Sequence, residues 1–179
     1  IAELIGELND HHIVTLTGSG GTGKTRLSLE VAAEGIDSFP DGVWFLELAP
    51  VTDPALVPNT LANLLGLRES GETKQSISEL ICGYLHSRKA LLVFDNCEHL
   101  IDSCARFADL LLHSCKDVKI LATSREALGV AGELAWHVPS LSLPDIKHLP
   151  AFDQYSQFEA VRLFIERALL VQPHFTVTN

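Results

Sequence analysis

The sequence Gly18-Ser19-Gly20-Gly21-Thr22-Gly23-Lys24-Thr25 matches G-x-x-x-x-G-K-[ST], the pattern of a phosphate-binding loop or P-loop. An apolar run typical of a β-strand, 13–17, precedes this loop, and a run with helical character, 26–33, follows it. Glycines let the backbone turn tightly and direct consecutive N–H groups at phosphate oxygens, and the helix presents its positive end to the same anion. This context predicts a binding site for a nucleoside triphosphate.

The residue types in the loop also predict separate roles. Lys24 is expected to reach the β- and γ-phosphates as a mobile point charge, and Thr25 to place its hydroxyl on Mg²⁺. The predicted nucleotide-binding residues are Ser19, Gly20, Gly21, Thr22, Gly23, Lys24, Thr25 and Arg26.

A second acidic group is needed near Thr25, because Mg²⁺ prefers hard oxygen ligands. Asp95 follows a continuous apolar run, 90–94, which suits a strand buried on both faces, and such strands place their ligands at the carboxyl end. We therefore predict that Asp95 and Thr25 hold the metal ion. The alternative is an aspartate that simply begins a turn.

Three further polar residues follow the predicted strands. Arg125, after the run 118–123, is predicted to sense the γ-phosphate and to offset charge in the transition state, the alternative being a solvated surface arginine. Glu98 is a possible general base, or else a residue that begins a helix. Because Asn96 directly follows Asp95 and takes up no proton at neutral pH, any hydrolysis that depends on it or on Glu98 is expected to be slow. The predicted catalytic residues are Lys24, Asp95, Glu98 and Arg125.

Strand-like and helical runs alternate along the chain, which predicts an α/β doubly wound sandwich with a mainly parallel five-stranded sheet. The further expected strands are 43–48, 90–95, 118–123 and 134–138, and the expected helices are 55–65, 76–86 and 101–115. Ser156 and Glu159 predict a capping box for a last helix, and its apolar residues, Val161, Phe164, Ile165 and Ala168, are expected to face the core. We expect a lead-in helix at 1–10, a P-loop core at 11–150 and a C-terminal helical segment at 151–179, with a mobile polar loop at 69–72.

The composition restricts the class of protein. The chain has 179 residues, of which 46% are hydrophobic and 20% charged, as expected of a folded domain with a sizeable core. Its net charge of −10 and lack of clustered Lys and Arg argue against direct contact with nucleic acid. No run of 18 apolar residues is present, so no membrane span is predicted. Because the first residue is Ile, we expect a segment of a longer protein.

The four cysteines form no C-x-x-C pair. Cys104 and Cys115 share a helical face with apolar residues, which favours core thiols over a zinc site with His99 or His113. Reduced thiols in such a domain predict a cytoplasmic protein.

Taken together, TLTGSGGTGKTRL, LLVFDNCEHL and ILATSREALGVAGE resemble the ATPase domain of the STAND class of P-loop NTPases. More narrowly, they resemble the type found in large AfsR-like and LuxR-type bacterial transcriptional regulators and related signalling proteins, and the chain is similar also to the NB-ARC module. The resemblance implies a switch that is off with ADP and, with ATP and Mg²⁺, open for self-association of the parent protein. It further implies phosphate contacts from 20–25, a magnesium ligand at Asp95, a sensor arginine at Arg125 and a segment near the nucleotide at 136–139.

Three functions remain open at this point. The first is a slowly hydrolysing, nucleotide-dependent switch in a signalling or transcriptional regulator. The second is a module that binds nucleotide without turnover, which Asn96 favours. The third is a P-loop phosphoryl transferase, which the scattered arginines after Asp95 disfavour because a lid rich in arginine is expected there.

Overall fold

The computed structural model describes residues 1–68, 75–145 and 152–176, so the predicted mobile loop at 69–72 lies outside the described residues. The chain divides into two compact units, Ile1–Val138 and Pro139–Asn179. The strands of the first unit are β1 (Ile13–Thr17), β2 (Val43–Glu47), β3 (Ala90–Asp95), β4 (Val118–Ser124) and β5 (Glu133–His137). Its α-helices are α1 (Ala2–Asp10), α2 (Lys24–Glu34), α3 (Val57–Leu65), α4 (Ile77–Leu85) and α5 (Ile101–Ser114).

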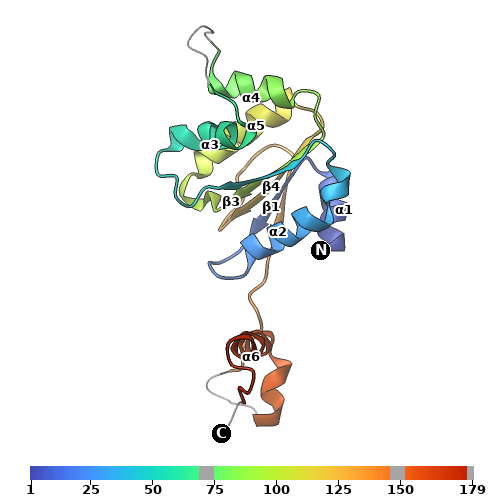
Figure 1. Cartoon of the computed structure of the whole chain (residues 1–179), viewed down its shortest axis with the longest axis vertical. Coiled ribbons are helices and arrows are strands. Elements are labelled where there is room, and N and C mark those ends of the chain that lie inside the picture. Colours follow the sequence, from blue (N-terminus) through green and yellow to red (C-terminus); the bar gives the residue numbers. More distant parts are fainter. Residues whose placement is uncertain (69–74, 146–151, 177–179) are drawn as a thin grey trace. The chain divides into compact units, whose positions relative to one another are not determined.

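The five strands form one parallel sheet in the order β2-β3-β4-β1-β5 (Figure 1), which confirms the predicted fold class. The order is not that of the sequence, because β4 lies between β1 and β3. The carboxyl ends of these three strands therefore lie side by side, with the end of β4 between the P-loop and Asp95.

Two apolar cores cover the two faces of the sheet. Helices α3, α4 and α5 lie on one face and α1 and α2 on the other (Figure 1). Strand residues alternate between the two cores, as the period of two in a strand requires. In β3, for example, Leu92 and Phe94 pack toward α3–α5, whereas Leu91 and Val93 pack toward α1 and α2. All four side chains are fully buried, as expected of a parallel sheet between two helical layers.

Three of the four cysteines are buried in this unit, and all four are free thiols. Burial raises the pKa of the Cys115 thiol to about 11, so that this thiol stays protonated at neutral pH. The described residues contain no group of three or more His, Cys, Asp or Glu side chains placed to hold a metal ion. The prediction of core thiols is thus confirmed, and the zinc alternative finds no support.

The second unit contains a 3₁₀ helix, Phe152–Gln157, and α6 (Glu159–Val171). The predicted capping box is wrong, because Ser156 lies within the 3₁₀ helix and gives α6 no side-chain cap. Instead, Glu159 Oε2 accepts a 3.0 Å hydrogen bond from the Ser142 N–H, and the Glu159 N–H donates one of 3.0 Å to Ser142 Oγ.

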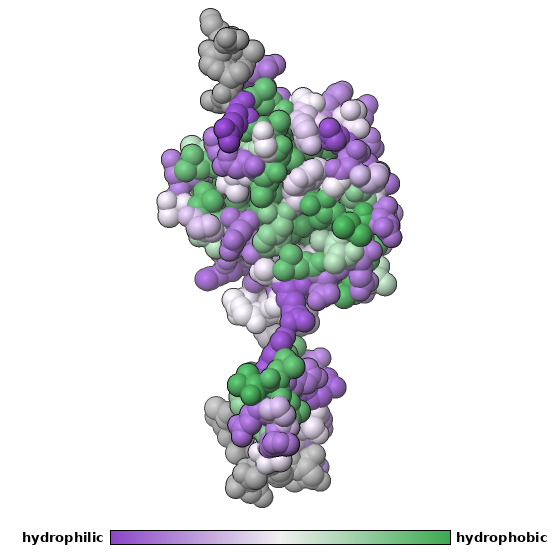
Figure 2. All heavy atoms as spheres, in the orientation of Figure 1, coloured by the Kyte–Doolittle hydropathy of each residue, from purple (hydrophilic) through white to green (hydrophobic). Residues whose placement is uncertain are grey.

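The predicted burial of the apolar face of α6 is also wrong. No residue of this helix is buried, and Phe164 is 62% exposed, although its ring packs edge-to-face against Phe175 at 5.9 Å between centroids. A unit this small encloses little apolar surface. Figure 2 shows hydrophobic side chains on the surface of this unit.

A capping box does form at another Ser-x-x-Glu pattern. At the start of α4, Ser76 Oγ accepts from the Glu79 N–H, and Glu79 Oε2 accepts from the Ser76 N–H. The other connecting 3₁₀ helices are Ile36–Ser38, Pro54–Leu56 and Cys97–His99.

Candidate nucleotide-binding site

The P-loop connects β1 to α2 over residues 18–23, as the sequence predicts. The backbone φ angles of Gly18, Gly21 and Gly23 are 148°, 81° and 88°, which residues with a Cβ rarely adopt. Gly18 also has no room for a side chain, because a Cβ there would lie 2.7 Å from the Val138 carbonyl oxygen. The glycine pattern therefore reflects both backbone conformation and close packing against the segment after β5.

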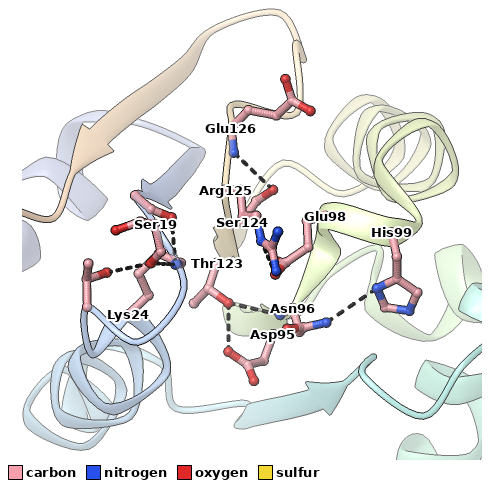
Figure 3. A network of polar contacts seen from close by, with 12 residues as sticks. Ser19, Lys24, Asp95, Asn96, Glu98, His99, Thr123, Ser124, Arg125 and Glu126 are labelled. Carbon is pink, nitrogen blue, oxygen red and sulfur yellow. Dashed lines mark hydrogen bonds and ion pairs between the residues drawn. The ribbon is translucent and has the colours of Figure 1, made fainter.

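Lys24 begins α2 and turns back over the loop. Its Nζ donates hydrogen bonds of 2.8 Å to the carbonyl oxygens of Gly18 and Ser19 (Figure 3), and the residue is only 9% exposed. No carboxylate among the described residues forms an ion pair with it. A nearly buried ammonium with neutral partners alone is suited to binding an anion, because burying a charge without a counter-charge is costly.

Asp95 ends β3 beside the start of α2. Its Oδ1 accepts hydrogen bonds of 2.8 Å from Thr25 Oγ1 and 2.7 Å from Thr123 Oγ1, and the residue is 7% exposed. The predicted magnesium ligands Thr25 and Asp95 thus lie in direct contact. Their hydroxyl and carboxylate oxygens are of the hard type that Mg²⁺ prefers, so this pair of residues fits the ion.

Arg125 and Glu98 form an ion pair at the same edge of the sheet. Arg125 follows β4, Glu98 lies in the 3₁₀ helix after β3, and Nε is 3.3 Å from Oε1 (Figure 3). The Arg125 side chain is 69% exposed and that of Glu98 20%. The two predicted residues are therefore ion-paired with each other.

Asn96 joins β3 to this 3₁₀ helix in a left-handed conformation, with φ at 68°, the one positive value among the described residues other than glycine. Its N–H donates a 2.9 Å hydrogen bond to Thr123 Oγ1. Thr123 therefore accepts from Asn96 and donates to Asp95, so that it joins the two residues at the end of β3 (Figure 3).

A cavity of about 530 Å³ lies over these groups. It is lined by Gly20, Gly21, Gly23, Lys24, Thr25, Arg26, Leu29, Asn96, Glu98 and Thr123. Four predicted site residues do not line the cavity: Ser19, Thr22, Asp95 and Arg125. Ser19 and Thr22 belong to the P-loop, whereas Asp95 and Arg125 are hydrogen-bonded to the lining residues Thr25 and Glu98.

Sequence reasoning missed Leu29 and Thr123. The signal for Thr123 is a hydroxyl residue at the carboxyl end of an apolar strand, which becomes informative only once β4 is known to adjoin β3. The segment 136–139, expected near the nucleotide, contacts the P-loop through Val138, whose N–H donates to the Thr17 carbonyl at 2.8 Å, but it does not line this cavity.

Comparison with known families agrees with this geometry. A model of the AAA domain matches residues 8–129, and the chain belongs to this family. The fold and the family together define an AAA-type P-loop nucleotide-binding domain.

Curated relatives extend the likeness over nearly the whole chain. A Mycobacterium tuberculosis protein with the provisional name HTH-type transcriptional regulator is 41% identical over 172 residues, 96% of this chain and 18% of that protein. An uncharacterized protein of the same species is 41% identical over 170 residues, 95% of this chain and 39% of that protein. The chain thus spans less than half the length of either relative.

Solved structures share the fold. Cdc6p from Pyrobaculum aerophilum has a TM-score of 0.52 at 17% identity, covering 74% of this chain and 42% of its own. A signal transduction ATPase with numerous domains from Pyrococcus horikoshii has a TM-score of 0.50 at 20% identity, covering 76% of this chain and 22% of its own. Among the described residues, none of the helices has the length and hydrophobicity that crossing a bilayer requires.

Proposed function

We propose that this domain binds ATP with Mg²⁺, hydrolyses it slowly and acts as the nucleotide switch of a signalling or transcriptional regulator. The observation that carries the proposal is the 2.8 Å hydrogen bond between Thr25 Oγ1 and Asp95 Oδ1, beside the cavity that Lys24 lines. A P-loop hydroxyl and a strand-end carboxylate in contact form the two protein ligands expected of a magnesium–nucleotide site.

The proposed roles follow from the groups that face the cavity. Backbone N–H groups of the loop and the amino end of α2 bind phosphate oxygens, with Ser19 to Arg26 as the binding segment. Lys24 exchanges its two carbonyl contacts for phosphate oxygens, which supply the negative charge that it lacks. Thr25 and Asp95 would hold Mg²⁺, which would neutralise part of the negative charge of the phosphates when bound.

Slow turnover is expected from the two polar residues of the cavity lining that closely follow Asp95 in the sequence, Asn96 and Glu98. Asn96 accepts no proton, and Glu98 is engaged by Arg125. We propose that Arg125 turns to the γ-phosphate when a triphosphate binds, which frees Glu98 to act as the general base. Only a small fraction of the enzyme–ATP complexes has made this exchange at any moment, so hydrolysis is slow.

The switch part of the proposal rests on the same arginine. Converting a mostly closed population to a mostly open one requires a ligand that binds the open state about 5 kcal/mol more tightly than the closed state. Contacts to the γ-phosphate from Lys24 and Arg125 exist with ATP and not with ADP, so they are a source of that difference. The name of one relative, an HTH-type transcriptional regulator, and that of one structural neighbour, a signal transduction ATPase with numerous domains, support this role. Self-association of the parent protein and the likeness to the NB-ARC module are further parts of the proposal.

A second function, nucleotide binding without turnover, is favoured by one specific observation. The position directly after Asp95 holds Asn96, an amide in a constrained left-handed conformation rather than a carboxylate. If Glu98 stays bound to Arg125 with ATP present, no described residue of the cavity lining accepts the proton of water.

The test compares the wild type with Lys24→Ala and with Lys116→Ala, which removes an exposed lysine outside the cavity lining. Nucleotide extracted from each purified protein is identified by chromatography, and phosphate release is then measured with added ATP and Mg²⁺. We expect bound nucleotide and slow release from the wild type and Lys116→Ala, and neither from Lys24→Ala. Bound nucleotide without phosphate release above the Lys24→Ala background would favour the second function, and absence of binding would contradict both.

A further inference from the structure

The orientation of the Asn96 side-chain amide decides whether this residue presents a hydrogen-bond acceptor or a donor to the cavity. Its backbone is held by the left-handed φ of 68° and by the N–H bond to Thr123 Oγ1. The remaining freedom is a half-turn of the amide, which exchanges an acceptor, Oδ1, for a donor, Nδ2. An acceptor can align the O–H of a water molecule, whereas the donor cannot.

A neighbouring histidine determines which of these two orientations is adopted. His99 Nε2 lies 2.9 Å from the carbonyl oxygen of Val51, and a carbonyl oxygen only accepts. The proton of the neutral ring is therefore on Nε2, which leaves Nδ1 as an acceptor. His99 Nδ1 lies 3.3 Å from Asn96 Nδ2 (Figure 3), so the amide NH₂ group faces the ring and donates to it.

The consequence is that Oδ1 is the amide atom left for other partners. No side chain or N–H of the described residues donates a hydrogen bond to it, and Asn96 lines the cavity. A single backbone carbonyl, that of Val51, thus fixes the tautomer of His99, and the tautomer fixes the amide of Asn96.

We propose that His99 is a positioning residue which holds Asn96 with Oδ1 ready to accept a hydrogen bond from the attacking water. This inference rests on the proposed ATP hydrolysis and assigns a residue that acts in it through another. In the step concerned, the water oxygen bonds to the γ-phosphorus while the bond from that phosphorus to the β,γ-bridging oxygen breaks. The proton of the water passes to Glu98, and ADP and phosphate are the products.

The first test is His99→Gln, because glutamine places an amide donor where Nε2 lies and no acceptor where Nδ1 lies. The Asn96 amide then loses the contact that selects its orientation. We expect kcat to fall about ten-fold, the effect of losing one net hydrogen bond, while KM and the Kd for ATP stay unchanged. The matched control is His86→Gln, an exposed histidine whose Nδ1 meets the Ser114 carbonyl at 3.0 Å near the opposite ends of the strands.

A second background separates positioning from a general structural effect. In Asn96→Asp both terminal oxygens accept, so the orientation of the group no longer matters. Adding His99→Gln to Asn96→Asp is therefore expected to leave kcat unchanged. A ten-fold loss that persists in this background would assign His99 a structural role and overturn the proposal.

The third readout needs no turnover. Long-range ¹H–¹⁵N spectra of the nucleotide-free protein at mildly alkaline pH report the tautomer of each histidine ring, and the His99 signals are those missing from His99→Gln. We expect the Nε2–H tautomer, and the Nδ1–H tautomer would overturn the proposal. Equal kcat for wild type and His99→Gln would do the same, whereas failure of the wild type to bind ATP would instead contradict the proposed function itself.

Discussion

Arg125 Nε lies 3.3 Å from Glu98 Oε1, so the arginine that directly follows β4 is held by a carboxylate from the 3₁₀ helix after β3. Binding of a triphosphate through Arg125 must first break this pair. The replacement Glu98→Gln removes the charge and is expected to tighten ATP binding up to about five-fold, since an exposed pair of this kind contributes at most about 1 kcal/mol.

The affinity for ADP is expected to stay the same, because ADP has no γ-phosphate for Arg125 to reach. Calorimetric titration with each nucleotide measures both values. Glu126→Gln is the control, since it removes an equal charge one residue beyond Arg125 from a side chain outside the cavity lining. Equal tightening for both nucleotides, or in the control, would show a general charge effect instead.

The contact between Thr25 and Asp95 predicts how magnesium acts on stability. Thr25→Val keeps the shape of the side chain but removes the hydroxyl, whereas Thr25→Ser keeps the hydroxyl. At a ligand concentration about 100 times Kd, ATP with Mg²⁺ is expected to stabilise the wild type and Thr25→Ser by about 3 kcal/mol.

Part of the stabilisation of the wild type by ATP depends on Mg²⁺ and is lost when EDTA removes the ion. This magnesium-dependent part should be absent in Thr25→Val. Thermal melts with ATP, with and without Mg²⁺, measure it for each variant. A magnesium-dependent rise in Tm that survives in Thr25→Val would show that the hydroxyl is not a ligand.

Two glycines of the P-loop are expected to respond differently to substitution by alanine. Gly18 has a φ of +148° and lacks space for a Cβ, whereas a Cβ at Gly20 would meet nothing within 4 Å and its φ is not positive. Gly18→Ala is therefore expected to reduce the free energy of unfolding by about 1–3 kcal/mol, and Gly20→Ala to change it little. Urea denaturation of both variants checks this difference, and similar midpoints for the two would contradict the packing of Gly18 against Val138.

Much of the site could be predicted because its signals are local in the sequence. The P-loop combines a fixed spacing of glycines with the charge of Lys24, and Asp95 ends a run of five apolar residues, 90–94, that only a doubly covered strand explains. Each pattern follows directly from what the local structure requires of its residues. The sheet follows from them, since alternating strands and helices favour parallel pairing.

The parts that could not be predicted depend on contacts between distant residues. The place of Thr123 follows from β4 pairing with both β1 and β3, which no local pattern encodes. The His99 contact to Val51 joins residues 48 positions apart. In α6, the apolar period was present without a core to bury it, because periodicity shows which face is apolar and not whether another element covers that face.

Glu159 gives the second unit a pH-dependent contact. Hydrogen bonding to the Ser142 N–H, and then to its side chain, lowers the pKa of Glu159 from its ordinary value of 4.5. Since the folded pKa is the lower one, the contact stabilises the start of α6 at pH values above the ordinary pKa. This contribution is lost as the pH falls through the lowered pKa.

Substitutions at Ser142 separate the two hydrogen bonds that lower this pKa. Ser142→Ala removes the hydroxyl and should raise the pKa of Glu159 partway toward its ordinary value. Ser142→Pro also removes the N–H, which is the larger cause, and should raise this pKa further. An NMR titration of the Glu159 carboxyl carbon measures the pKa in each variant, with the same chain unfolded in urea as the reference. An unchanged pKa in Ser142→Pro would show that the contact does not form in solution.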